Sequence, residues 1–401
     1  MKPAILGGRP AFAQPLDIVR PLLPRADALR DRFDAALRSG QVTNMSRHSR
    51  ELEAAVAEYV GTKHCAVFCN GEAALIAMLQ AARLPRGTEV ITPAYSFSGT
   101  AHGIVWAGLV PVFADIDAGT WTLDPADAER RITTRTAAIL PAPVFGNPCD
   151  NDALEALAAR RGIRLLFDSA SGCGSRYRGR PLGGFGLAEM FSFHATKVFA
   201  TMEGGAICTD DPALHEAACM IRNFGKNGRD GDCDFVGFNG KMTEIAALVG
   251  LELLPTLDAV VAHRNRVAAW YGERLSGVPG VTLQAVQRHG VSSWLYYQFL
   301  VDQREFGLTR DELLAALTAE NIAARRLFFP PNHQLSCYRT LGEPSHLPVT
   351  ERIAHQSVAL PAYSDMSVDE VERIAGCVAA VYEAGEAVRA TLRGARQGAG
   401  V

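Results

Sequence analysis

The sequence predicts an α/β protein, in which a mostly parallel seven-stranded sheet is flanked by helices and is followed by a smaller α+β domain. Two observations support this prediction. Short apolar runs without strict alternation recur between about residues 64 and 210, as expected of strands buried on both faces of a mostly parallel sheet. Helix-favouring stretches separate several of these runs, and that alternation is typical of α/β proteins.

Seven runs are the expected strands: HCAVFCN (64–70), EVITPAYS (89–96), VPVFADID (110–117), TAAILPAPV (136–144), IRLLFDSA (163–170), MFSFHAT (190–196) and GAICTD (205–210). Helices fit between several of them. EAALIAMLQAAR follows the first run, and NDALEALAARRG precedes the fifth. Because ligands of such sheets lie beyond the carboxyl ends of the strands, we expect the functional residues there.

A candidate domain boundary lies near Pro255. The helical pattern MTEIAALVGLELL begins after Lys241, meets this proline and resumes through HRNRVAAWYGERLSG. We therefore expect a large domain over residues 1–255 and a small domain over residues 256–401. The smaller domain contains a strand-like run, two helical patterns and their connections: YYQFLV (296–301), RDELLAALTAEN (310–321) and VDEVERIAGCVAAVYEAGEAV (368–388).

The composition argues against several classes of function. A net charge of −3 and a pI near 6.4 disfavour binding to nucleic acid or to an anionic membrane through bulk electrostatics. Nine cysteines occur without a CxxC pair or a Cys/His ligand spacing, which indicates no metal site and no disulfide framework and favours the reducing cytoplasm. The opening MKPAILGGRPAF lacks a signal-peptide core. The uncharged stretch between Glu89 and Asp115 is long enough to span a bilayer, but its glycines and prolines divide it into a strand, a loop and a helix.

Three features point to the same edge of the sheet. In CNGEAALIAML, Asn70 and Gly71 lie between a strand and a helix, where backbone amides could hold a phosphate or where the two residues could form an ordinary helix cap. Asp168 ends an apolar strand and could cap a turn or face a cationic ligand group. Lys197 follows the next strand, 29 residues later in the sequence. A lysine in such surroundings is less often a plain surface residue than one that stands alone.

A phosphate cradle, a carboxylate and a lysine together meet the needs of pyridoxal 5′-phosphate. The helix start would hold the phosphate, the carboxylate would keep the pyridine nitrogen protonated, and the lysine would form the Schiff base. Other cofactors have less support, because the sequence has no GxxxxGK[ST], no GxGxxG after the first strand and no HExxH.

At this point the sequence also resembles a known family, the DegT-type nucleotide-sugar aminotransferases of the aspartate-aminotransferase fold. The resemblance runs from GGRPAF near the start to PAY at 361–363. It is carried by GEAAL (71–75), ITPAYSF (91–97), PVFGNP (143–148), FDSA (167–170), FSFHATK (191–197), EGGAI (203–207), GFNGKM (237–242) and PPNH (330–333). The large domain is therefore expected to have an aspartate-aminotransferase-like fold.

The resemblance implies roles for individual residues. Lys197 matches the Schiff-base lysine and Asp168 the partner of the pyridine nitrogen. Phe97 matches the aromatic residue that stacks on the cofactor, although an aromatic in an apolar run is also often core. Gly71 and Glu72 match the backbone contact to the phosphate, with Glu at a position where the family commonly has Thr.

Further matches concern the phosphate, the partner subunit and the sugar. Ser192 falls where a hydroxyl reaches the phosphate, and Asn239 where an asparagine reaches the phosphate bound by the neighbouring subunit of a homodimer. His333 falls in the segment that lines the sugar-nucleotide side of the pocket. Ser171 replaces the family's Gln or His near the cofactor's ring hydroxyl, and Lys241 replaces an Arg of many members on the substrate side.

The implied reaction is a transamination in two stages. L-Glutamate would convert the cofactor to its amine form, and the amine would then condense with a ketone on a nucleotide-linked sugar. HATKVFATMEGG resembles members that aminate C4, so a TDP-4-keto-6-deoxyhexose is the expected acceptor. Such enzymes supply aminosugars for secondary metabolites, antibiotics among them, or for surface polysaccharides.

Other functions stay open at this point. The acceptor could be a 3-keto sugar, or the chain could be a non-catalytic regulator that binds pyridoxal phosphate. A related sugar dehydratase is disfavoured, because those enzymes replace the lysine with histidine and this sequence has Lys197. The spacing assigns no role to His194, which we expect to be structural.

Overall fold

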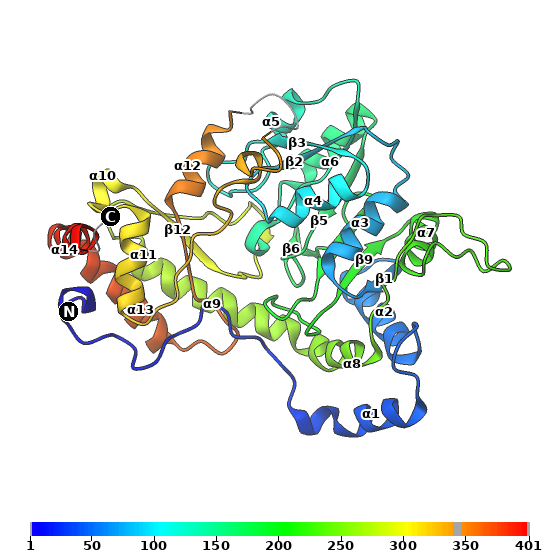
Figure 1. The fold of residues 1–401 in the computed structure, drawn as a ribbon, viewed down its shortest axis with the longest axis horizontal. Coiled ribbons are helices and arrows are strands. Elements are labelled where there is room, and N and C mark those ends of the chain that lie inside the picture. The colour runs from blue at the N-terminus through cyan, green and yellow to red at the C-terminus, as the bar shows by residue number, and fades with distance from the viewer. Residues whose placement is uncertain (1, 340–345, 399–401) are drawn as a thin grey trace.

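The central sheet has seven strands, and six of them run in the same direction. The computed structural model describes residues 2–339 and 346–398. The strand order is β1-β9-β8-β5-β4-β2-β3. Figure 1 labels β1, β2, β3, β5 and β9 of this sheet. Only β9 runs opposite to its neighbours, pairing antiparallel with β1 and β8. The mostly parallel seven-stranded sheet predicted from the sequence is therefore confirmed.

Each strand coincides with one of the predicted apolar runs, and most of their residues are buried, as expected of strands covered on both faces. Their bounds are β1 His64–Phe68, β2 Glu89–Pro93, β3 Val110–Ala114, β4 Thr136–Ile139, β5 Arg164–Asp168, β8 Ala188–Ser192 and β9 Gly205–Thr209.

Two layers of helices cover the sheet. The hydrophobic core on one face draws residues from α2, α5, α6 and α8, and the core on the other face draws residues from α3, α4 and α7. These helices are α2 Arg47–Val60, α3 Gly71–Ala81, α4 Ser98–Trp106, α5 Pro125–Arg130, α6 Asn151–Arg161, α7 Pro212–Arg222 and α8 Glu244–Leu253. Side chains of Asn, Asp and Thr cap five of them, at Asn70, Asp124, Asp150, Asp211 and Thr243.

The stretch 89–115 forms the predicted strand, loop and helix, which are β2, residues 94–97 and α4, and then enters β3, which was predicted as a separate strand. A different segment, Glu244–Leu275, is long and apolar enough to cross a membrane by length and composition, and half of its most apolar window is buried in the protein. It consists of α8, the 3₁₀ turn η3 (Leu254–Thr256) and α9 (Leu257–Leu275). Glu244 at its start is fully buried and accepts hydrogen bonds from the backbone of Ser46 and His48. Most residues of α8 within this segment are thus part of the core.

The C-terminal part is built on an antiparallel three-stranded sheet in the order β10-β12-β13. Its strands and helices are β10 Val281–Leu283, β12 Tyr297–Val301, α10 Gln303–Phe306, α11 Arg310–Ala319, α12 Pro348–Gln356, β13 Ser357–Leu360, α13 Val368–Glu383 and α14 Gly385–Gly398. The sequence predicted one final helix, but the chain breaks at Ala384, immediately before Gly385, into α13 and α14.

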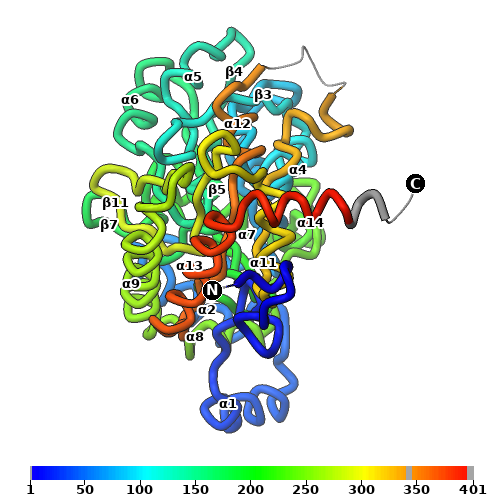
Figure 2. The backbone as a smooth tube through the Cα atoms, turned by 90° about the vertical axis from the view of Figure 1, so that its left-hand side faces the viewer, coloured from blue at the N-terminus to red at the C-terminus, as the bar shows by residue number. Residues whose placement is uncertain are grey.

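The N-terminal segment belongs to the core of the C-terminal part. Phe12 and Leu16 pack in the same cluster as residues of α9, α11 and α13, and Figure 2 shows the N-terminus beside α11 and α13. The chain then continues through α1 (Ala26–Ser39) to the large sheet. The boundary near residue 255 remains a prediction. The short remaining elements are η1 Ala4–Leu6, η2 Val144–Gly146, β6 Arg176–Tyr177, β7 Arg180–Pro181, β11 Gly290–Val291 and η4 Asn332–Gln334.

Candidate active site

A cavity of about 590 Å³ opens at the carboxyl edge of the parallel strands. Residues that follow β1, β2, β4, β5 and β8 line it, together with residues that precede β12 and others near residue 327. Seven of the residues predicted from the sequence contribute to its lining: Gly71, Glu72, Phe97, Asp168, Ser171, Ser192 and Lys197. Parallel strands bring these positions together because their carboxyl ends lie at one edge.

The start of α3 forms one wall of the cavity. The Asn70 side chain caps this helix by accepting a hydrogen bond of 2.8 Å from the N–H of Ala73. The N–H groups of the first turn have no acceptor within the helix and carry the positive end of its dipole. A Cβ atom added at Gly71 would lie only 2.7 Å from the Cβ atom of Ser192, so glycine permits the close approach of this helix start to β8. The interpretation as a helix cap is confirmed, and the same geometry provides a cradle for an anion.

Asp168 is the last residue of β5 and is 6% exposed. Its Oδ2 atom accepts a hydrogen bond of 2.6 Å from the Thr100 hydroxyl, and its Oδ1 atom accepts one of 3.2 Å from the N–H of Ala170. Burial raises the pKa of the Asp168 carboxyl, while these hydrogen bonds and the charge of Lys197 oppose that rise. The carboxylate is thus held in a buried position at the cavity wall.

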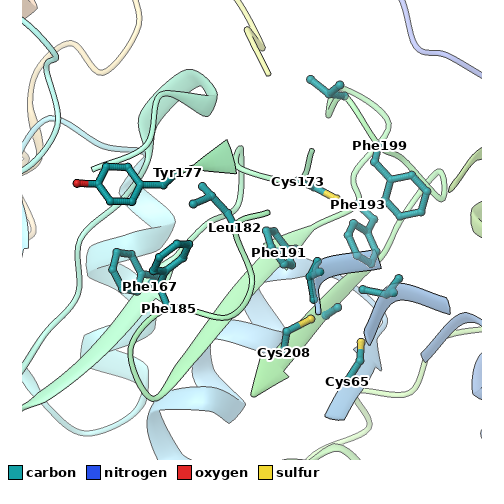
Figure 3. Packing of buried hydrophobic residues seen from close by; sticks show 14 of the residues in the cluster. Cys65, Phe167, Cys173, Tyr177, Leu182, Phe185, Phe191, Phe193, Phe199 and Cys208 are labelled. Atoms are coloured by element: carbon teal, nitrogen blue, oxygen red, sulfur yellow. The ribbon is translucent and has the colours of Figure 1, made fainter. Parts of the chain in front are cut away.

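Lys197 lies in a turn just after β8. Its N–H donates to the carbonyl of His194 at 2.8 Å. Phe191 and Phe193 are buried in the core on one side of the strand end, as Figure 3 shows, and Ser192 between them lines the cavity. Burial lowers the pKa of the Lys197 ammonium, and the charge of Asp168 opposes that shift. An amine with a lowered pKa is more readily available as a nucleophile or a base.

Phe97 stands at the N-cap position of α4 with 68% of its surface exposed, and it lines the cavity. The alternative that Phe97 is a core residue is therefore wrong. Its ring has room because residue 99 is glycine: a Cβ atom there would lie 3.0 Å from Cδ1 of Phe97. An exposed aromatic face beside a polar cleft can stack on a planar ligand.

The remaining cavity residues carry more negative than positive charge. Glu72 is exposed on the first turn of α3, and Glu203 lies 3.5 Å from the ring of His194, both at the cavity. Ser171 accepts a hydrogen bond from Ser293 through its backbone carbonyl, and it also lines the cavity. His194 was expected to be structural, and it lines the cavity as well.

Three predicted site residues do not line the cavity of the same chain. Asn239 is exposed and pairs through its backbone with Asn223. Lys241 donates to the Asn223 side chain at 3.3 Å, and its ammonium lies over the ring of Phe224. The ring of His333 is buried and lies 3.2 Å from Glu351 of α12. The roles given to these three residues remain predictions.

The sequence analysis missed several residues at the cavity. Thr100 is the most direct of them, since it donates to Asp168. Phe145, Tyr296 and Phe328 form an aromatic wall, in which the rings of Phe145 and Phe328 stack 4.9 Å apart. Phe145 lies in the PVFGNP motif, and this motif was the only sign in the sequence that Phe145 could belong to the site. The other two residues precede β12 and α12, and only the fold brings them to the cavity.

Comparison with known proteins identifies the family of this chain. The model of the DegT/DnrJ/EryC1/StrS aminotransferase family matches residues 25–379. The chain belongs to this family. A relative in Shigella dysenteriae, named dTDP-4-amino-4,6-dideoxy-D-glucose transaminase, is 33% identical over 91% of this chain and 98% of its own length. The resemblance predicted from the motifs is thus confirmed.

Solved structures of similar proteins agree with this assignment. The structure of DesI in the presence of its TDP-sugar product has a TM-score of 0.91 and 37% identity, covering 97% of this chain and 98% of that one. Helicobacter pylori PseC, described as an aminotransferase involved in the biosynthesis of pseudoaminic acid, has a TM-score of 0.86 and 28% identity, covering 92% and 100%. The fold of this DegT-family chain is therefore that of the aspartate aminotransferases, as predicted.

Pyridoxal phosphate is the cofactor of this DegT-family chain, and the residues present fit it. The cradle at Gly71 and Ser192 suits a phosphate, Asp168 suits a protonated ring nitrogen, and Phe97 suits the face of the ring. When bound, pyridoxal phosphate supplies an aldehyde that can join a primary amine and a ring that accepts electrons. Lys197 carries a primary amine and lines the same cavity.

Proposed function

We propose that this chain is a pyridoxal-phosphate-dependent aminotransferase that moves an amino group from L-glutamate to C4 of a TDP-4-keto-6-deoxyhexose. The observation that carries the proposal is one cavity that joins Asp168, Lys197 and the start of α3. The named relatives add support, since one is a transaminase of a dTDP-4-amino-4,6-dideoxyglucose and another was solved with a TDP-sugar. The chain covers almost the whole length of both.

In this proposal each residue at the cavity has a separate task. Nζ of Lys197 accepts and returns the proton that moves between the amino donor and the cofactor, a task favoured by the lowered pKa of its ammonium. The carboxylate of Asp168 keeps a proton on the ring nitrogen. Ser192 and the helix start at Gly71 bind the phosphate, and Phe97 orients the ring.

The aromatic wall gives the sugar a place to bind. Phe145, Tyr296 and Phe328 line the cavity, and they come from separate parts of the chain. Aromatic rings pack well on the apolar face of a deoxy sugar. This wall therefore supports an acceptor that carries a deoxygenated carbon.

We also infer that the enzyme is a homodimer with shared sites, in which Asn239 of one subunit reaches the phosphate bound by the other. Asn239 is exposed on the segment between α7 and α8, and its backbone pairs with Asn223 at the end of α7. Figure 1 shows a loop that extends beyond α7. The cavity of one chain has few cations for an anionic cofactor and an anionic sugar nucleotide, so a contribution from a second chain is reasonable. His333 and Lys241 are proposed to act on the substrate side. We place the enzyme in the cytoplasm, in a pathway that makes an aminosugar, such as that of an antibiotic.

The proposal is tested with a panel of nucleotide-linked 4-keto and 3-keto sugars, each incubated with the purified enzyme and L-glutamate. Mass spectrometry and NMR of the products identify the aminated carbon. We expect a 4-amino-4,6-dideoxy sugar nucleotide with the TDP-4-keto-6-deoxy substrate. If the enzyme aminates only a 3-keto sugar, the acceptor is a 3-keto sugar and the proposed 4-keto acceptor is wrong. A protein that binds the cofactor and aminates none of the sugars would favour the non-catalytic regulator.

A further inference from the structure

A short hydrogen bond joins α4 to the end of β5 at the wall of the cavity. The Thr100 hydroxyl donates to Oδ2 of Asp168 at 2.6 Å. Thr100 is 2% exposed and Asp168 is 6% exposed. A hydroxyl at this distance from a carboxylate oxygen forms a charge-assisted hydrogen bond, which is stronger than one between neutral groups. The hydroxyl therefore stabilises the ionised carboxylate over the protonated form.

The surroundings of Asp168 make this stabilisation important. Burial is the largest influence on its pKa and raises it, and the Thr100 hydroxyl is the largest opposing influence. The N–H of Ala170 and the charge of Lys197 also lower the pKa, whereas the carboxylate of Glu72 raises it. Without the hydroxyl, the balance would shift toward a neutral carboxyl, which cannot hold a proton on the pyridine nitrogen.

Thr100 also connects the carboxylate to the helix start that carries Phe97, whose ring lines the same cavity. Phe97 is the N-cap residue of α4, and Gly99 and Thr100 lie in the first turn of this helix. The N–H of Thr100 donates to the carbonyl of Phe97 at 3.1 Å, and Gly99 leaves room for the Phe97 ring. One helix start thus sets the position of a ring and of a carboxylate, which lie at the same cavity.

We propose that Thr100 is a positioning residue that holds Asp168 ionised and oriented toward the ring nitrogen of the cofactor. It acts through Asp168. The inference rests on the cofactor and not on the identity of the sugar, so its test is independent of the acceptor.

The test compares three variants, two of which each remove one buried hydroxyl. Thr100→Val removes the hydroxyl at nearly constant shape, and Thr100→Ser keeps it. Thr92→Val is the matched control, because Thr92 is also fully buried and its hydroxyl donates to the Leu140 carbonyl at 2.9 Å. Thr92 does not line the cavity. The readouts are the dissociation constant of pyridoxal phosphate, its dependence on pH, and the thermal stability of the apo protein.

We expect Thr100→Val to bind pyridoxal phosphate about 10- to 100-fold more weakly, the effect of one lost hydrogen bond to a charged group. Binding should also be lost at a higher pH as the solution is acidified, because Asp168 becomes protonated more readily. Thr100→Ser should bind within about threefold of the wild type, since the donor is kept. Thr92→Val should change thermal stability but leave both cofactor readouts unchanged.

The proposal is overturned if Thr100→Val binds the cofactor with the wild-type dissociation constant and the wild-type pH dependence. It is also overturned if Thr92→Val weakens cofactor binding as much as Thr100→Val does, because the effect would then reflect a general loss of stability. Should Thr100→Val fail to fold, Thr100→Ala provides the same comparison without the branched side chain. Wild-type binding by Thr100→Ala would overturn the proposal equally.

Discussion

Asp168 and Lys197 face one cavity from the ends of neighbouring parallel strands, and each changes the pKa of the other. Asp168 ends β5, and Lys197 lies in the turn that follows β8, which pairs with β5. The charge of Lys197 lowers the pKa of the carboxyl, and the charge of Asp168 raises the pKa of the amine, although burial outweighs both effects. Two ionisable groups with shifted pKa values at one cavity edge are typical of a functional site, which supports our proposal that the cofactor binds there.

Asp168→Asn should nearly abolish transamination while the protein still folds. An amide keeps the shape and can still contact Thr100, but it has no charge to hold a proton on the ring nitrogen. We expect kcat to fall at least about 100-fold, as for the loss of a group that acts in the chemical step. Steady-state kinetics measure this, with circular dichroism as the control for folding. An unchanged kcat would reduce Asp168 to a structural cap.

Glu72→Gln should strengthen cofactor binding. The Glu72 carboxylate is exposed at the helix start where the phosphate is expected, and it raises the pKa of Asp168. Its removal takes away repulsion from the phosphate and lowers the pKa of Asp168, so binding should persist to a lower pH. Titration with pyridoxal phosphate at a series of pH values from neutral to acidic measures both effects. Weaker binding at every pH would show instead that Glu72 makes a favourable contact.

Ser171→Gln should shift the pH at which the bound cofactor changes its visible absorbance. Ser171 lines the cavity with a short side chain, and the longer amide would reach further toward the ring. A donor beside the ring hydroxyl stabilises its ionised form and should move the transition to lower pH. A spectrophotometric pH titration tests this. An unshifted transition in a variant that still binds the cofactor would mean that residue 171 does not contact the ring.

Co-expression of two inactive variants tests the shared site. Lys197→Ala and Asn239→Ala should each be impaired, yet a mixed dimer should regain activity in one of its two sites if Asn239 acts across the interface. That site would combine an intact Lys197 with an intact Asn239, while the other would carry both defects. Two affinity tags isolate the mixed dimer for assay. Activity no higher than that of the parents would place Asn239 in its own chain's site or outside the chemistry.

The strands were predictable because a strand buried on both faces appears in the sequence as a short, nearly continuous apolar run. All seven strands of the large sheet coincide with apolar runs, and Asp168 and Lys197 follow from their places at strand ends. The order of the strands was not predictable from these runs, nor was the reversal of β9, since pairing depends on contacts between distant segments. The same reason explains why Phe12 belongs to the core of the C-terminal part.

The site was predictable only where a residue acts from its own strand end. Thr100 gave no signal, because its role depends on the packing of α4 against β5. Phe97 was ambiguous, since an apolar run does not reveal that its last aromatic residue turns out of the core. Phe328 is brought to the cavity by the C-terminal part, more than a hundred residues from the strand ends that it faces.

The identity of the lysine that binds the cofactor is the most direct test of this account. Borohydride reduction of the cofactor-loaded enzyme, followed by proteolysis and mass spectrometry of the peptides, identifies the modified residue. We predict that the cofactor is attached to Lys197 alone, and that Lys197→Ala folds but has no transaminase activity. Attachment to a different lysine, or near-normal activity of Lys197→Ala, would contradict the assignment of this cavity as the active site.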